Sequence, residues 1–273
     1  MNAVTIDPTA AAQASLDRPR LLGLRNLVRK DLSEWVHGKR PWIVMAVTTI
    51  VFAFATANAW ISEWAVRSLP AEPGDGPAKA VSMLPLDNVL FAIGTQFIAL
   101  AVIFATMSLL IAERDSGTLA WTISKPVSRT SVLVSKWLTA TLILWVAAVV
   151  VPLAVTTVLA TVLYGLPDLG TVVILGVTLI TVPAFFVAVA LAAGTLVPSQ
   201  AAVGAIGMAV FAAPLIIAGI VPVLAPFFPG SIFDWVVGFS LGAPSSLVTP
   251  IAWLVGLAGL FALARARLIA MDL

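Results

Sequence analysis

The sequence contains no cysteine and a single histidine, His37, among its 273 residues. It therefore has no disulfide framework, no thiolate metal site and no cysteine nucleophile, and most histidine-based catalysis is excluded as well. Charged residues make up only 10% of the chain, against about a quarter in soluble domains, while 60% is hydrophobic. So few charges cannot cover the apolar surface of a soluble fold of this size. The composition indicates an integral membrane protein rather than a soluble, disordered or collagen-like one.

Long segments without any charge define the expected membrane spans. A bilayer core about 30 Å thick takes roughly 20 apolar residues as a helix. Residues 169–233 are charge-free and long enough for two helices, which we expect to be joined at the polar break 197–200. We therefore predict an all-α fold with six spans at 41–62, 88–112, 137–164, 171–196, 201–226 and 247–264. Five or seven spans remain an alternative if residues 226–246 dip into the membrane.

Lysine and arginine lie mainly on alternate sides of the expected spans. Residues 18–40, 113–136 and 265–273 carry seven, four and two of them, whereas the intervening loops carry only Arg67 and Lys79. Because these residues resist translocation, we predict that both termini are cytoplasmic in a multi-pass protein of the inner (plasma) membrane. Residues 265–273 would form a cytoplasmic tail. The basic residues are thus an insertion signal, and we expect no nucleic-acid partner.

The residues before the first span divide into two parts. Residues 1–17 are polar and alanine-rich and lack the pattern of a signal peptide, so we expect them to be disordered. Residues 18–40 are amphipathic, because a period of about 100° per residue places apolar side chains on one face and basic ones opposite. The apolar face is defined by Leu24, Val28, Leu32 and Trp35. This segment suits a helix at an anionic membrane surface, although Asp31 interrupts its apolar face. It either only anchors the first span or also contacts a cytoplasmic partner.

The expected spans lack the residues that drive transport or catalysis. None of the six contains Asp, Glu, Lys, Arg or His, which commonly mark ion and proton pathways. No phosphate-binding loop of the form Gly-x-x-x-x-Gly-Lys-Ser/Thr is present. Any active transport must therefore be driven by another chain, and a membrane-embedded enzyme is disfavoured. A passive channel or structural bundle remains the alternative.

The segment between the second and third expected spans has local signals for a short helix. Gly117 allows a sharp turn where the second span ends, and residues 118–123 can then form a helix that presents Leu119 on one side. Pro126 stops that helix, and Ser128 is placed to cap the next one. A short helix between two breaks, flanked by charged residues, indicates either an ordinary charged loop or a docking element for another protein.

This segment resembles the signature of type 2 ABC transporter permeases. The resemblance consists of an acidic residue at the end of the second span, a Gly-Thr-Leu turn, a Ser-x-Pro-Val-Ser-Arg run and a lysine before the third span. The matching residues are Glu113, Gly117, Thr118, Leu119, Ser124, Pro126, Val127, Ser128, Arg129 and Lys136. The amphipathic segment and the six spans fit the same family, so the resemblance extends over nearly the whole chain.

The resemblance implies a transport subunit without catalytic activity of its own. In that family the short helix is a coupling helix that docks on a separate ATPase, and two ATPases work with two permease copies. The coupling positions would be Glu113, Arg114, Gly117, Thr118, Leu119, Pro126, Ser128 and Arg129. ATP and Mg²⁺ would bind to the partner ATPase, and this chain would hold no cofactor or metal. The chain would then be the permease of an ATP-driven exporter.

Overall fold

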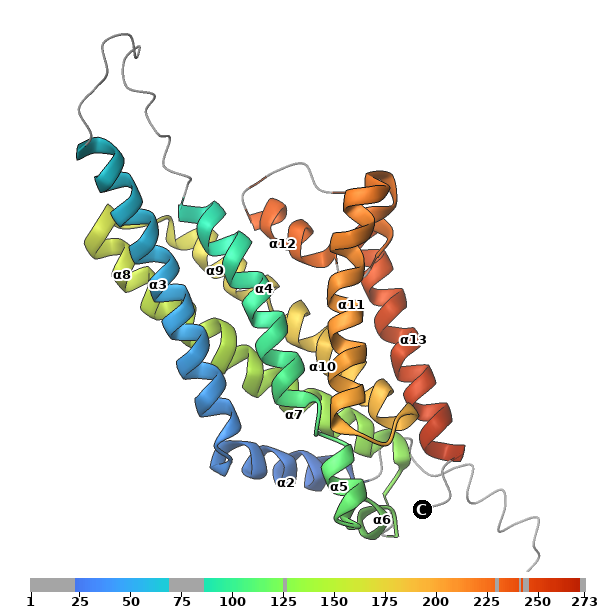
Figure 1. The fold of residues 1–273 in the computed structure, drawn as a ribbon. Helices are drawn as coiled ribbons and strands as arrows, with labels where there is room; N and C mark the ends of the chain where they lie inside the picture. The colour runs from blue at the N-terminus through green and yellow to red at the C-terminus, as the bar shows by residue number, and fades with distance from the viewer. Residues whose placement is uncertain are drawn as a thin grey trace, which may run out of the picture.

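The computed structural model describes residues 23–68, 86–124, 127–228, 231–240, 242 and 246–270. In these residues every regular element is a helix (Figure 1). The α-helices are α2 (Leu24–His37), α3 (Arg40–Ser68), α4 (Leu86–Thr106), α5 (Ile111–Asp115), α6 (Thr118–Ile123), α7 (Arg129–Trp145), α8 (Val151–Tyr164), α9 (Leu169–Thr178), α10 (Thr181–Leu196), α11 (Gln200–Ile220), α12 (Ile232–Ser240) and α13 (Val248–Ala270). A π-helix, η1 (Val146–Val150), joins α7 to α8, and a 3₁₀ helix, η2 (Pro222–Phe227), follows α11. The expected disordered segment 1–17 lies outside the described residues.

Five stretches of the described chain are long and apolar enough to cross a membrane. They are Arg40–Asn58, Gln96–Asp115, Arg129–Tyr164, Leu169–Leu196 and Val248–Ala270. Each overlaps one of the predicted spans. The remaining predicted span coincides with α11, in which Gln200–Pro214 is a shorter apolar stretch. The helical membrane fold is thus confirmed, whereas the count of six stays a prediction.

The expected single helices are interrupted at three places. A turn at residues 107–110 separates α4 from α5, η1 lies between α7 and α8, and residues 179–180 separate α9 from α10. Proline explains two of these breaks, because its ring clashes with the carbonyl four residues earlier. For Pro152 that carbonyl belongs to Ala148 in η1, and for Pro183 it belongs to Leu179 at the break. The spans are therefore kinked rather than straight.

Two ends of the predicted spans differ from the structure. The last helix continues past 264 to Ala270, so Arg265 and Arg267 lie on α13 rather than on a separate tail. The helix predicted for 201–226 ends at Ile220, because Pro222 begins the 3₁₀ helix η2. The short helix α12 then lies within the region 226–246 and packs against α9, α10 and α13 through buried Ile232 and Val236.

Helix α10 forms the centre of the bundle. All of its residues from Val182 to Thr195 are buried, and it contacts α4, α7, α11 and α13. Much of this stretch is alanine or glycine, and small residues allow helices to approach closely. At Gly194, an added Cβ would lie 3.1 Å from Cβ of Leu110. The close approach of α10 to its neighbours therefore requires small residues.

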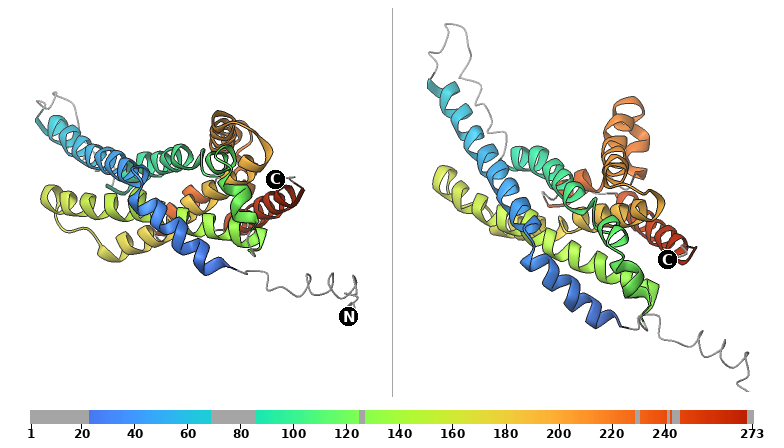
Figure 2. Two further views of the ribbon diagram at one scale, coloured as in Figure 1. Left: turned by 90° about the horizontal axis from the view of Figure 1, so that it is seen from below. Right: turned by 60° about the horizontal axis from the view of Figure 1, so that its bottom comes forward.

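Helix α2 lies across one end of the bundle, close to α6 and to the C-terminal end of α13 (Figures 1 and 2). It begins after Gly23, whose φ is +79°, and packs on α7. Its buried residues are Leu27, Asp31 and Trp35. Leu32 is 40% exposed and does not take part in this packing, whereas the polar Asp31 does. Leu24 and Val28 are half-buried at the edges of the contact.

Candidate coupling site

The segment that resembles the family signature begins with two short helices, α5 and α6, joined by a tight turn. Residues 111–129 are called the coupling segment below. The second helix, α6, spans the predicted residues Thr118–Ile123, and Gly117 before it has a φ of +71°. Glycine reaches this left-handed conformation without steric cost. The Thr118 hydroxyl donates to the Glu113 carbonyl at 3.3 Å and lies 2.9 Å from the Ser116 hydroxyl. These contacts hold the turn, and they leave Gly117 and Thr118 exposed.

Leu119 points into the protein rather than outward. It is completely buried in an apolar cluster with Leu27 of α2, Leu133 of α7 and Leu268 of α13. The side of α6 on which the sequence places Leu119 is thus its inner side. Trp121, two residues later, is 62% exposed on the outer side. Leu119 instead anchors α6 to three other helices.

A buried ion pair fixes the end of the second span to the start of the third. The ammonium of Lys136 lies 2.7 Å from Oε1 of Glu113 and 3.9 Å from Oδ1 of Asp31. The Ser135 hydroxyl donates to Oδ2 of Asp31. All three charged residues are at least nine-tenths buried. This group, Asp31, Glu113 and Lys136, is called the coupling cluster below, and it joins α2, α5 and α7.

Lys30 and Glu34 of α2 lie at the edge of the coupling cluster. The Lys30 ammonium is 3.4 Å from Oε1 of Glu113 and 4.0 Å from Oε2 of Glu34. Burial lowers the pKa of Lys30, but the carboxylates of Glu113 and Asp31 more than offset this effect, so its pKa lies above the ordinary value. Lys30 is therefore a firmly charged partner of the cluster at neutral pH.

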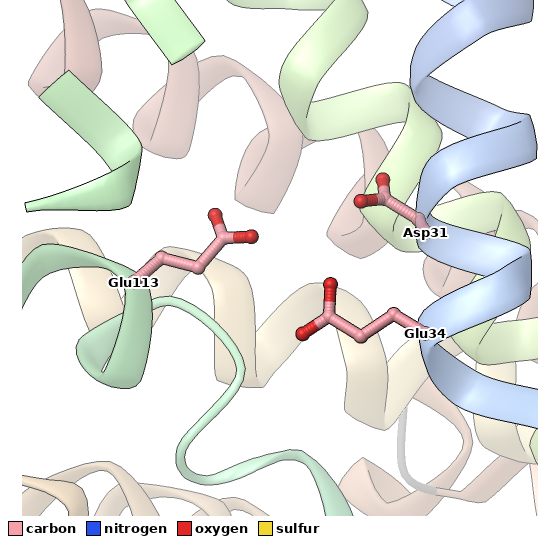
Figure 3. Close-up of side chains that lie close together, drawn as sticks. All are labelled: Asp31, Glu34 and Glu113. Atoms are coloured by element: carbon pink, nitrogen blue, oxygen red, sulfur yellow. The ribbon is translucent and has the colours of Figure 1, made fainter. Parts of the chain in front are cut away.

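Three carboxylates converge at this site, as Figure 3 shows. Oxygen atoms of Asp31, Glu34 and Glu113 all lie within 4.8 Å of one another, close enough to hold a metal ion. Lys136 and Lys30 already approach Oε1 of Glu113, so the protein itself supplies two positive charges beside the three carboxylates. The arrangement fits a structural ion-pair network between helices.

The other predicted coupling residues connect the segment to the rest of the bundle. The Arg114 guanidinium donates to the Val197 carbonyl at 3.5 Å, and Arg129 donates to the carbonyls of Leu268 and Ile269, the latter at 2.9 Å. A cation at the last carbonyls of a helix such as α13 is electrostatically favourable. Ser128 caps α7, as predicted, by accepting from the Ser131 amide at 3.0 Å. Pro126 lies outside the described residues.

Two cavities flank the contact between α2 and the coupling segment. One, of about 360 Å³, lies towards the start of α3, and the other, of about 310 Å³, lies towards α6 and includes Thr118 and Trp121 in its walls. Glu34, Ala112 and Glu113 line both. The surface beside α6 is therefore hollowed on the side that faces α2.

The sequence pattern alone missed the partners of Glu113. Lys136 was matched to the family signature, but Asp31, Lys30 and Glu34 were not expected near the coupling segment. The available signal was Asp31 itself, since a carboxylate on the apolar face of a helix needs a partner when it is buried. Two of its partners, Ser135 and Lys136, lie more than 100 residues away in sequence.

Comparison with known protein families identifies the same group of transporters. Residues 25–231 match the family described as ABC-2 family transporter protein. This match spans the coupling segment and most of the bundle. The chain belongs to the ABC-2 transporter family.

Membership defines the general role of this ABC-2 transporter protein. It is a multi-pass membrane protein and a transport subunit rather than a catalyst, and members of the family normally work with an ABC ATPase. A search of curated proteins finds no match to the chain.

Proposed function

We propose that this protein is the permease of an ATP-driven exporter and that a separate ATPase docks on α6 and the adjoining side of α2. Two ATPase copies, with their ATP and Mg²⁺, and a second permease copy complete the transporter. The observation that carries the proposal is the short exposed helix α6, which is tied to several helices of the bundle. A passive channel or structural bundle has no use for such an element.

The contacts of α6 explain how a push from an ATPase would reach the membrane helices. Leu119 belongs to a buried cluster with side chains of α2, α7 and α13, and Glu113 pairs with Lys136 at the start of the third span. Packed interiors transmit displacement because they are nearly incompressible. Movement of α6 therefore moves α7 and α2 with it, and the kinked spans alternate which side of the permease dimer is open.

The proposed topology places the docking surface in the cytoplasm. With six spans and both termini cytoplasmic in the inner membrane, α2, α6 and the end of α13 face the cytoplasmic ATPases. Figure 1 supports this arrangement, because these three elements lie at the same end of the bundle. The translocation path then lies between the two permease copies.

Site-directed cross-linking tests the proposal, because the chain has no cysteine and a single introduced one is unique. We would purify tagged Ser116→Cys protein from its native membrane and treat it with a thiol-directed photo-crosslinker. The control is Val162→Cys, which is 77% exposed and lies two residues before the end of α8. Figure 1 shows α8 away from α6. We expect an adduct with an ATP-binding subunit from Ser116→Cys and none from Val162→Cys.

Coupled ATP hydrolysis provides the second measurement. The co-purified complex should hydrolyse ATP, and Gly117→Pro should uncouple hydrolysis from transport while the protein stays inserted and dimeric. Normal transport by Gly117→Pro would contradict the role of α6. A preparation without any ATPase, together with no adduct at position 116, would favour a passive bundle.

A further inference from the structure

The larger cavity beside α2 lies where this helix turns into α3. It has a volume of about 360 Å³, in the range of sites for small molecules. Its walls carry six charged residues, namely Asp31, Glu34, Lys39, Arg40, Glu113 and Lys136. Apolar walls come from Trp35, Pro41 and Leu109. The cavity therefore combines both signs of charge with an apolar surface.

The charged residues that line this cavity differ in how they are paired. The coupling cluster with its edge residues holds three carboxylates, whereas among the described residues two ammonium groups, those of Lys136 and Lys30, approach them. Glu34 contributes the carboxylate that is most accessible, because its side chain is 65% exposed and its ammonium partner is 4.0 Å away. This group of residues carries an excess of one negative charge.

Lys39 and Arg40 are the other two basic residues in the cavity wall. Both are exposed, and neither makes an ion pair with any residue of the described chain. A ligand with an anionic group near Lys39 and Arg40 and a cationic group near Glu34 would place each of its charges beside residues of opposite charge. Arginine and lysine are the usual protein partners of phosphate, and a primary ammonium donates charge-assisted hydrogen bonds to a carboxylate.

The position of the cavity indicates where that ligand comes from. Arg40 is the first residue of one apolar stretch, Arg40–Asn58, and Glu113 lies close to the end of the next, Gln96–Asp115. The cavity is thus at the boundary between membrane core and water. Trp42 and Ile43, directly after it, are each 60% exposed and offer an apolar surface at the depth of acyl chains.

We propose that this cavity binds the headgroup of a zwitterionic phospholipid with a primary amine. The phosphate lies beside Lys39 and Arg40, the ammonium lies beside Glu34, and the acyl chains follow the start of α3. This inference goes beyond the exporter function and does not depend on it. A lipid held here packs against the elbow between α2 and α3 and stabilises its angle.

Lipid titration of the purified full chain tests the proposal. We would measure binding of dioleoyl phosphatidylethanolamine and dioleoyl phosphatidylglycerol by native mass spectrometry. The two lipids share acyl chains and phosphate and differ in the amine. We expect tighter binding of phosphatidylethanolamine. Because both charge contacts are partly exposed, each is expected to change the affinity by about 3- to 5-fold.

Two substitutions test the phosphate contact and the ammonium contact separately. Arg40→Gln should weaken both lipids about equally, since it removes a phosphate contact. Glu34→Gln should weaken phosphatidylethanolamine alone and abolish the preference. Arg25→Gln is the matched control, because Arg25 is exposed on α2 but does not line the cavity, and it should change neither affinity.

Several outcomes would overturn the assignment. Equal binding of the two lipids, or tighter binding of phosphatidylglycerol, contradicts the ammonium contact, and so does an unchanged preference in Glu34→Gln. If Arg40→Gln, like Arg25→Gln, changes neither affinity, the phosphate contact is contradicted. Thermal unfolding of each variant verifies that these exposed substitutions leave the fold intact. No ATPase is needed, so these results are independent of the test of the exporter function.

Discussion

Lys136 links the three helices of the coupling cluster, α2, α5 and α7. Its ammonium pairs with Glu113 at the end of the second span and approaches Asp31 on α2, and all three groups are removed from water. Burying an ion costs several kcal/mol, which is recovered only while its partners are present. The stability of the site therefore depends on keeping the charges paired rather than on any one attraction.

Substitution of Lys136 should be more damaging than substitution of Glu113. We expect Lys136→Met to lower the free energy of unfolding by about 3–5 kcal/mol, because it leaves buried carboxylates facing each other. Glu113→Gln should cost less, since Lys136 retains Asp31 at 3.9 Å. Denaturant titration in mixed micelles measures both. The double variant Lys136→Met/Glu113→Gln should lose less free energy of unfolding than the two single variants together. A loss equal to their sum would contradict a direct interaction between Lys136 and Glu113.

Two glycines with positive φ allow a matched comparison. At Gly117 an added Cβ has no atom within 4 Å, so Gly117→Ala should cost only the left-handed backbone strain of about 1 kcal/mol. At Gly23 the Cβ would lie 2.5 Å from Cγ1 of Val127, so Gly23→Ala should cost about 1–3 kcal/mol more. Thermal unfolding compares the two variants. Val127→Ala should rescue part of the loss in Gly23→Ala and none of it in Gly117→Ala.

At the scale of single elements, the kinked spans are held by side chains of their neighbours. At the break between α9 and α10, the Ile180 amide donates to the Val177 carbonyl, three residues back. The carbonyl of Gly176 accepts from the indole N–H of Trp145 at 2.8 Å. Trp137 makes a similar bond to Ala184 of α10, also at 2.8 Å. Helix α7 thus holds the kinked α9–α10 pair in place with two indole groups.

The indole contact of Trp145 should contribute measurably to stability. Trp145→Phe keeps an aromatic ring but leaves the Gly176 carbonyl without this donor, so we expect a loss of about 1 kcal/mol in the free energy of unfolding. Trp42→Phe is the control, because Trp42 is 60% exposed on α3. Equal small effects of the two substitutions would show that the bond does not stabilise the kink.

At the scale of the whole molecule, the topology follows from which loops share a side of the membrane. We expect single cysteines at His37, Ser124 and Ser199 to react with an impermeant thiol reagent from the same side. Cysteines at Leu166 and Leu247 should react only from the other side. Intact cells and inverted vesicles supply the two accessible faces.

The pair of positions around α11 decides the number of spans. If α11 crosses the membrane, cysteines at Ser199 and Leu247 react from opposite sides. If it does not, both react from the same side, and the six-span arrangement with both termini in the cytoplasm is wrong. The reaction at Ser124 serves as the internal reference in both cases.

The sequence by itself determined those features that depend on neighbouring residues. Charge-free segments identified a helical membrane protein, Gly117 and the residues after it defined α6, and the polar break at 197–200 separated α10 from α11. The sequence also predicted that Ser128 caps the helix that follows it, α7. Each of these signals lies within one continuous segment of the chain, where residue type and spacing are sufficient.

Only the tertiary structure decided which side chains meet. The inward position of Leu119 and the burial of Asp31 with Ser135 and Lys136 depend on how α2, α7 and α13 pack around the coupling segment. An amphipathic pattern shows that a face is apolar, but it does not show which helix covers that face. Contacts between residues about 100 positions apart are selected by the packing of the whole bundle, which no local pattern encodes.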